Sequence, residues 1–127
     1  MNPKAREHRF RRLKEIGCWP CNVIGFPEMY PEIHHLNEGG HAGQERRGDE
    51  FTIPLCRWHH QGVCLPGYAE TQMLVMFGPS LKLHSCLFRK RFGTDDVILA
   101  KVDAEIARRD RVAFGWMHPV TEAEMSQ

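Results

Sequence analysis

Two short pairs of metal-binding residue types stand far apart in the chain: Cys18 with Cys21, and Cys56 with His59. Each pair has two residues between its members, so a tight turn lets it wrap one edge of a tetrahedron. Thiolate and imidazole are the ligands that structural zinc ions take in proteins. The spacing therefore predicts one structural zinc ion held by these four side chains. The alternative, two unrelated pairs of buried residues, leaves the paired spacing unexplained.

Other histidines remain once the zinc ligands are assigned. His34 and His35 are adjacent, His60 directly follows a zinc ligand, His84 comes later, and Asp49 lies between the two pairs. Hydrolysis of a phosphodiester needs an activated water, a positive centre beside the oxygens that gain charge, and support for the leaving group. Histidines with one divalent metal ion can supply all three. We therefore interpret these residues as a second, catalytic site that the zinc holds in place.

Alternatives stay open for these histidines. Neighbouring residues of a strand point to opposite faces, so one of His34 and His35 can be a core or surface side chain without a catalytic task. His60 can instead cap its own helix or replace His59 at the zinc, and His84 can be a histidine that binds no metal.

The first 17 residues carry six basic side chains against two acidic ones, although the net charge of the whole chain is only +1. A basic arm of this kind can neutralise phosphates and release counterions. Four of its residues are candidates for DNA contact: Arg6, Arg9, Arg12 and Lys14. The same charges fit the solvated face of a helix whose apolar side points inward, and both descriptions can hold together.

The elements that must position these side chains follow from the apolar spacing. Residues 3–16 have apolar side chains at helical spacing, which predicts a helix. Residues 32–36 and 51–55 fit two short strands bounded by turn residues. Residues 57–61 then open another helix. This order places the adjacent histidines on the first strand and the second zinc pair at the start of the second helix.

The rest of the chain is less regular. Residues 37–48 contain four glycines and predict a loop that can bend close to a phosphate backbone. Residues 62–79 fit either a short helix or a surface insertion, and residues 83–92 predict a helix. Thr94 is an N-cap for a last helix, whose inward stripe consists of Leu99, Val102 and Ile106.

Length and composition bound the class of protein. A chain of 127 residues fits one domain with its own core. No apolar run has the length of a membrane span, and the N-terminal segment is charged, so we expect neither insertion nor secretion but a cytoplasmic protein. Its five cysteines are then better explained as metal ligands and buried thiols than as disulfides.

The motifs occur in a set order along the chain. A Cys-x-x-Cys pair precedes Ile-His-His-Leu at residues 33–36, a glycine-rich loop, and Ile-Pro-Leu-Cys-Arg-Trp-His-His at residues 53–60. This order resembles the HNH, or ββα-metal, nucleases. More narrowly, it is similar to the Ref recombination-enhancement nucleases of phages, in which cleavage depends on RecA filaments, and residues 88–95 resemble the segment that follows the nuclease motif there. The resemblance covers about residues 15–106.

The resemblance implies a role for each candidate residue. His35 would be the general base that takes a proton from the attacking water, and His34 would bind the metal or orient the base. Asp49 stands where many HNH enzymes have asparagine, and it would raise the basicity of His35 or reach the metal. His60 and His84 would bind a catalytic Mg²⁺ or a related divalent ion.

We therefore expect an α+β fold with a small zinc-stabilised ββα-metal (HNH) core and flanking helices. Residues 1–17 would form the basic N-terminal helix, residues 18–114 the nuclease domain and residues 115–127 a tail. The expected function is a metal-dependent DNA endonuclease, phage-encoded and acting in recombination on RecA-bound DNA. The alternative is a zinc-ribbon module that binds DNA or protein without cutting, although such a module needs no histidines beyond the zinc set.

Overall fold

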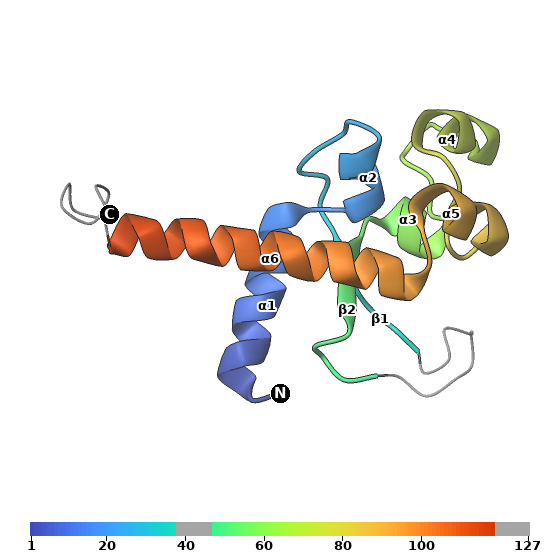
Figure 1. The fold of residues 1–127 in the computed structure, drawn as a ribbon. Helices are drawn as coiled ribbons and strands as arrows, with labels where there is room; N and C mark the ends of the chain where they lie inside the picture. The colour runs from blue at the N-terminus through green and yellow to red at the C-terminus, as the bar shows by residue number, and fades with distance from the viewer. Residues whose placement is uncertain (38–46, 119–127) are drawn as a thin grey trace.

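The computed structural model of the protein describes residues 1–37 and 47–118. In these two stretches, six helices accompany one two-stranded sheet (Figure 1). The elements in chain order are α1 (Pro3–Ile16), α2 (Trp19–Val23), β1 (Glu32–His35), β2 (Thr52–Leu55), α3 (Arg57–Gln61), α4 (Glu70–Phe77), α5 (Ser85–Phe92) and α6 (Asp95–Met117). The arrangement is α+β, as the sequence predicts. Most of the predicted glycine loop lies outside the described residues.

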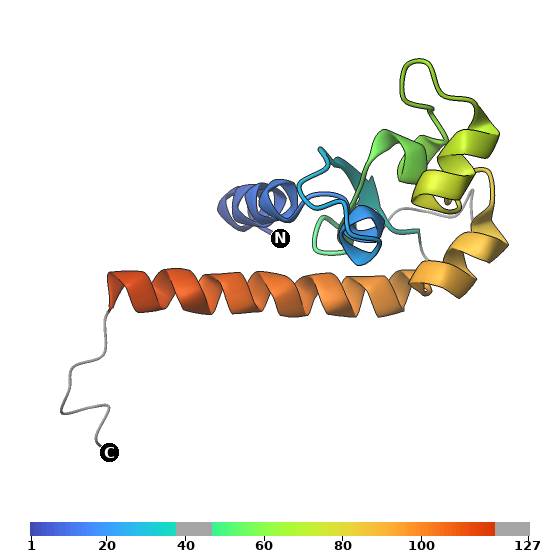
Figure 2. The same ribbon diagram turned by 90° about the horizontal axis from the view of Figure 1, so that it is seen from above.

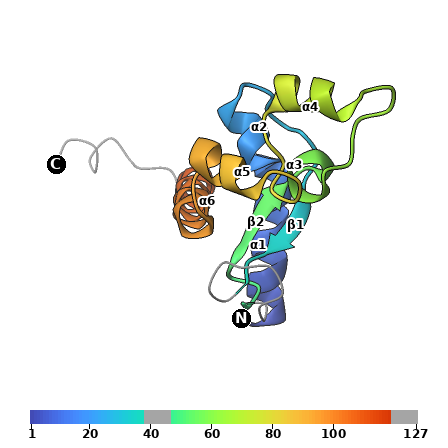
Figure 3. The same ribbon diagram turned by 90° about the vertical axis from the view of Figure 1, so that its right-hand side faces the viewer.

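The sheet is an antiparallel pair in which His35 of β1 lies opposite Thr52 of β2. Figure 3 shows the two strands side by side, with α3 at the end where β2 leads into it. Successive residues of a strand point to opposite faces. Glu32 and His34 therefore share one face of β1, and Ile33 and His35 share the other.

α1 begins and ends at residues that the sequence marks clearly. The Asn2 side chain accepts a hydrogen bond from the Ala5 N–H at 2.8 Å, and Pro3 occupies a first-turn position. Gly17 ends the helix with φ at 78°, an angle that glycine adopts without strain. A Cβ at that position would lie only 3.1 Å from the carbonyl oxygen of Met29. The predicted helix over residues 3–16 is confirmed.

The main hydrophobic core lies between α1, the sheet, α5 and α6. Its fully buried side chains come from all of these parts: Leu13, Leu36, Ile53, Leu55, Phe88, Ile98 and Val102. The inward stripe predicted for α6 is confirmed with one added member: Leu99, Val102, Ile106 and Ile98. Thr94 caps this helix by accepting a hydrogen bond from the Val97 N–H at 3.4 Å.

Two arginines, of which Arg9 is buried, tie α1 to the sheet and to α6. Arg9 donates from Nε to Thr52 Oγ1 at 2.9 Å and from Nη2 to the Thr52 carbonyl at 2.6 Å. Its Nη1 donates to Asp103 at 2.7 Å. Arg12, one turn later, donates from Nε to Asp110 at 2.8 Å. Two of the four residues suggested for DNA contact are thus bonded to other parts of the fold.

α6 is longer than the part of the molecule it packs against. Its buried positions end at Ile106, and its last turns extend beyond the other elements (Figures 1 and 2). These turns carry exposed apolar side chains: Val112, Phe114, Trp116 and Met117. The helix continues past Gly115, where the predicted tail begins, and residues 119–127 of that tail lie outside the described residues. No described helix combines the length and apolar character that crossing a bilayer requires.

Two short helices differ from the expectation or refine it. α2 was not predicted, and it places the first cysteine pair at the start of a helix, with Cys18 as its N-cap, rather than in a turn. Within residues 62–79, α4 favours the short helix over the surface insertion. A second apolar cluster joins α4 to the candidate zinc ligands, and it includes Trp58, Met73 and Phe77.

Candidate active site

The predicted zinc ligands converge between α2 and α3. Cys18 and Cys21 lie at the start of α2, and Cys56 is the N-cap of α3, with His59 one turn further on. The Nδ1 atom of His59 lies 3.4, 3.4 and 3.3 Å from the three sulfurs, two of which are 3.8 Å apart. Tetrahedral zinc with Zn–S bonds of about 2.3 Å has ligands about 3.8 Å apart. The four donor atoms, all within 4.8 Å of one another, therefore fit one zinc ion.

The carbonyl oxygen of Phe77 orients His59. Nε2 of the ring lies 2.8 Å from that oxygen, so Nε2 carries the proton and donates it. The lone pair of Nδ1 is then directed at the three sulfurs. Metal-binding histidines almost always have their other ring nitrogen fixed by such a partner. Since His59 is also fully buried, it is better placed than His60 to be the fourth ligand.

The three cysteine thiols cannot all be ionised at low cost unless a cation is bound, because adjacent thiolates repel one another. Burial raises the pKa of the Cys18 thiol to about 12. Contacts with the neighbouring sulfurs raise the pKa of Cys21 and lower that of Cys56. A divalent cation allows all three sulfurs to carry charge. The donor set thus fits zinc in its chemistry as well as in its distances.

A second cluster lies where α3 meets β1. Nδ1 of His34 and Nε2 of His60 are 3.1 Å apart. On the other side of the His60 ring, Nδ1 lies 2.9 Å from Glu32 Oε1, which also accepts a hydrogen bond from Gln61 Nε2 at 2.7 Å. Adjacent ligands of an octahedral divalent ion with bonds of about 2.1 Å lie about 3.0 Å apart. The two imidazole nitrogens match that spacing, so they can hold one divalent ion between them.

His35 points to the opposite face of β1, toward α1. Its Nε2 lies 2.9 Å from Asp49 Oδ1, and its ring meets the Phe10 ring edge-on. Asp49 is fixed in turn, because Thr52 Oγ1 donates to its backbone carbonyl at 2.7 Å. The hydrogen bond from His35 lowers the pKa of the Asp49 carboxyl, and the charge of Arg6, 3.9 Å away, acts in the same direction. The result is a carboxylate and a histidine held in a defined orientation.

His84 lies among a different set of residues. It stands directly before α5, where its Nε2 is 3.3 Å from Glu70 and its Nδ1 accepts a hydrogen bond from the Ser80 N–H at 3.2 Å. Its ring centre is 6.1 Å from that of Trp58. The interactions described for His84 therefore connect α4 and α5, and they do not include the two histidines of the second cluster.

Sequence reasoning did not single out Glu32, although one signal pointed to it. Glu32 precedes His34 by two strand positions, and residues at that spacing share a face. An acidic side chain beside a candidate metal ligand is a common orienting partner. Among the residues suggested for DNA contact, Arg6 and Lys14 are exposed on α1, and Arg6 also forms the ion pair with Asp49.

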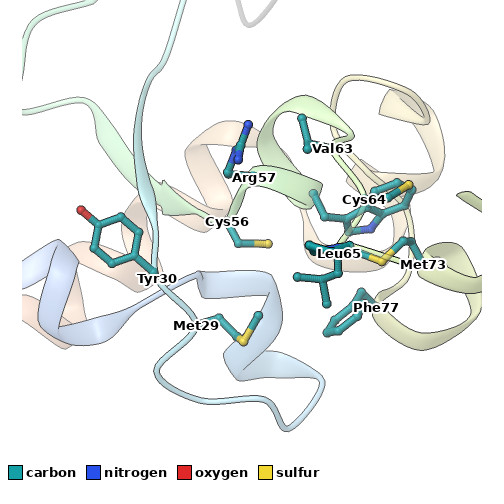
Figure 4. A pocket seen from close by; sticks show the side chains of 11 residues that line it. Met29, Tyr30, Cys56, Arg57, Val63, Cys64, Leu65, Met73 and Phe77 are labelled. Carbon is teal, nitrogen blue, oxygen red and sulfur yellow. The ribbon is translucent and has the colours of Figure 1, made fainter. Parts of the chain in front are cut away.

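An apolar pocket of about 230 Å³ adjoins Cys56, one of the candidate zinc ligands (Figure 4). Figure 4 shows Cys56 and Met29 on one side of it, with Leu65, Met73 and Phe77 on the other. An apolar surrounding lowers the local dielectric and strengthens the attraction between thiolate and cation. Together with the burial of all four donor residues, this apolar surrounding favours a closed, structural role for an ion bound there.

Comparison with known proteins adds one match. A family model described as "Recombination enhancement, RecA-dependent nuclease" matches residues 3–107. The match begins at the first residue of α1 and ends one residue after the last buried position of α6. It thus includes the candidate zinc ligands and both histidine clusters, and it leaves out the projecting turns of α6. No curated protein and no solved structure matches the chain.

Proposed function

The chain belongs to the family of recombination-enhancement, RecA-dependent nucleases, and from this premise we propose that it is a divalent-metal-dependent DNA endonuclease of the HNH, or ββα-metal, type. Its substrate is DNA, as a nuclease of recombination requires. We place it in a phage recombination system that cuts DNA bound by RecA. The observation that carries the proposal is the pair of histidine clusters on opposite faces of β1.

The order and contacts of the elements support the HNH type. β1, β2 and α3 follow one another in the chain and contact one another. Each contributes to one small region: His34 and His35 come from β1, Asp49 from the turn before β2, and His60 from α3. The zinc ligands lie at the start of α3 and tie it to α2. The structural ion thus supports the element that presents a catalytic ligand.

His35 has the arrangement of a general base. Its Nε2–H donates to Asp49, so the lone pair of Nδ1 can accept a proton from an attacking water. The Asp49 carboxylate stabilises the imidazolium that results and holds the ring in one orientation. His35 is half-buried and not fully enclosed, which leaves room for a water and a phosphate.

His34 and His60 would hold the divalent ion, Mg²⁺ or a related cation. Such an ion, when bound, stabilises charge on the scissile phosphate and on the leaving oxygen. The chain's own contribution is to present Nδ1 of His34 and Nε2 of His60 at adjacent ligand positions. Arg6 and Lys14, exposed on α1, would contact phosphates further along the DNA. His84 is left out of this proposal because its interactions lie between α4 and α5.

A nicking assay on single-stranded, duplex and RecA-coated DNA, each with and without Mg²⁺, tests the proposal. The parent protein should cut only with Mg²⁺ and only in the RecA-coated samples. His35→Ala should keep its fold and zinc but lose about 10²- to 10⁴-fold in kcat. His118→Ala, at an exposed histidine near the end of α6, is the matched control and should cut at the parental rate. If His35→Ala cuts at the parental rate, His35 is not the general base. If the parent binds DNA but cuts none of the samples, the zinc-ribbon module is favoured instead.

A further inference from the structure

We propose that Glu32 is a positioning residue that sets the tautomer of His60 and directs its Nε2 at the metal site. This inference rests on the proposed function and names a residue that the mechanism above does not use. Glu32 Oε1 lies 2.9 Å from His60 Nδ1, on the far side of the ring from His34. The three side chains form a line from carboxylate to imidazole to imidazole.

Hydrogen-bond chemistry determines the direction of this line. A carboxylate can only accept, so the proton between Glu32 and His60 belongs to Nδ1 of the ring. Nε2 of His60 then carries a lone pair, and that atom is the one 3.1 Å from His34. Without Glu32 the ring is free to move its proton to Nε2, in which case it cannot bind a cation there. The carboxylate also makes the imidazole a stronger ligand.

Glu32 is itself held in place. Gln61 Nε2 donates to the same oxygen at 2.7 Å, and Gln61 is the residue after His60 on α3. The side chain of Glu32 is 30% exposed and that of His60 is 24% exposed, so neither is part of the hydrophobic core. The pairing of β1 with β2 uses backbone groups. The sheet therefore does not need this carboxylate, and loss of it should leave the fold intact.

A second carboxylate–histidine pair in the chain provides a matched control. Glu70 lies 3.3 Å from Nε2 of His84, and both residues belong to the segment of α4 and α5. The pair has the same residue types and similar exposure of the histidine, 17% against 24%. The pair makes no described contact with His34 or His60. Glu70→Gln therefore shows how much the loss of a carboxylate–histidine pair away from the proposed metal site changes Mn²⁺ affinity and stability.

The affinity of the zinc-loaded protein for Mn²⁺, measured by calorimetry, tests the inference. Glu32→Ala should bind Mn²⁺ about 10- to 100-fold more weakly than the parent. Glu32→Gln keeps an acceptor oxygen without the charge, so its affinity should fall in between. Glu70→Gln should bind like the parent. Zinc content and the thermal midpoint should be unchanged in all three variants.

Nitrogen NMR of the His60 ring supplies a readout that a purely structural role would not change. In the parent without Mn²⁺, Nδ1 should be the protonated nitrogen; in Glu32→Ala the proton should move in part to Nε2. An Mn²⁺ affinity within about twofold of the parent, or an unchanged tautomer in Glu32→Ala, would overturn the inference. If the parent binds no Mn²⁺, the metal site of the proposed function fails and Glu32 with it. If His60→Ala abolishes binding while Glu32→Ala does not, only the role of Glu32 fails.

Discussion

The two adjacent histidines are informative because their side chains have different partners. A strand sends neighbouring side chains to opposite faces, so His34 meets His60 of α3 whereas His35 meets Asp49 beside α1. The sequence left open whether one of them was an ordinary core or surface histidine. His34 has a second imidazole as its partner, as a metal site requires, and His35 has a carboxylate, as a general base requires. The two clusters are connected through the backbone of β1.

At the same scale, Arg9 shows how a buried bond changes the expectation for a basic residue. Replacing Arg9 by alanine leaves the Thr52 carbonyl and Asp103 without their donor. We expect a loss of about 2–4 kcal/mol in the free energy of unfolding, because unsatisfied buried groups and broken ion pairs cost that much. Urea unfolding of the zinc-loaded protein measures it.

Arg11→Ala is the control for this prediction, since Arg11 is exposed on the same helix. Its stability should stay within about 0.5 kcal/mol of the parent. Parental stability of Arg9→Ala, together with a salt dependence of DNA binding reduced by about 0.9 in slope, would instead assign Arg9 to a phosphate.

At the scale of elements, α6 has a first part that packs into the core and a last part that projects beyond it. The final turns of α6 extend beyond Ile106 with their apolar side chains exposed. Arg12 of α1 ties Asp110 to the rest of the fold, and local pairs add further support to this part of the helix. Glu105 accepts hydrogen bonds from Arg108 at 2.7 Å and from Arg109 at 3.0 Å, one turn later in each case.

These ion pairs predict that the contribution of Glu105 to the free energy of unfolding depends on pH. The hydrogen bond from Arg108 lowers the pKa of Glu105 from 4.5 to about 2. A depressed pKa in the folded state gives stability that is present above the ordinary pKa and lost as the pH falls through the folded one. Arg108 is exposed and solvent screens the pair, so we expect Glu105→Gln to cost only about 0.5–1 kcal/mol at pH 7.

Thermal unfolding of the parent and of Glu105→Gln at several pH values checks this expectation. The difference should shrink from pH 5 downward and vanish near pH 2. Glu7→Gln, at an exposed position of α1, serves as the charge-matched control. A difference that grew on acidification would contradict the assignment of the ion pairs.

Much of the element order could be predicted from the sequence, because capping residues and glycines mark the ends of α1 and α3 and the start of α6. The cluster of three cysteines and His59 that could hold zinc could be predicted too, since the spacing alone brings each pair together. The partners of the other histidines could not. Glu32 and Asp49 lie far from His60 and His35 in the chain or in different elements, and only tertiary contacts show which carboxylate faces which ring. The surroundings of His84 depend on residues 62–79, whose structure the sequence left open, because Glu70 in that segment contacts the His84 ring.

At the scale of the whole molecule, the zinc ion should decide whether the chain folds. Structural zinc contributes an apparent 10–16 kcal/mol in small peptides, about as much as the roughly 5–15 kcal/mol of a whole domain. Removal by a strong chelator, or Cys56→Ser, should therefore unfold the protein. Circular dichroism with metal analysis measures the loss. Cys86→Ser, at an exposed cysteine outside the cluster, is the control and should melt like the parent. A normal melting curve for the metal-free protein would refute a structural zinc.

α3 has only five residues, and two neighbours in it face different clusters. His59 lies against the three sulfurs of the candidate zinc site, and His60 lies against β1, where the proposed catalytic ion would bind. Such a short helix cannot lose its first turn and keep its second. Partial chelation should therefore produce a mixture of fully competent and incompetent molecules, not a population of slowed ones. In steady-state kinetics the maximal velocity would fall in proportion to the zinc removed, while the KM for DNA stayed constant.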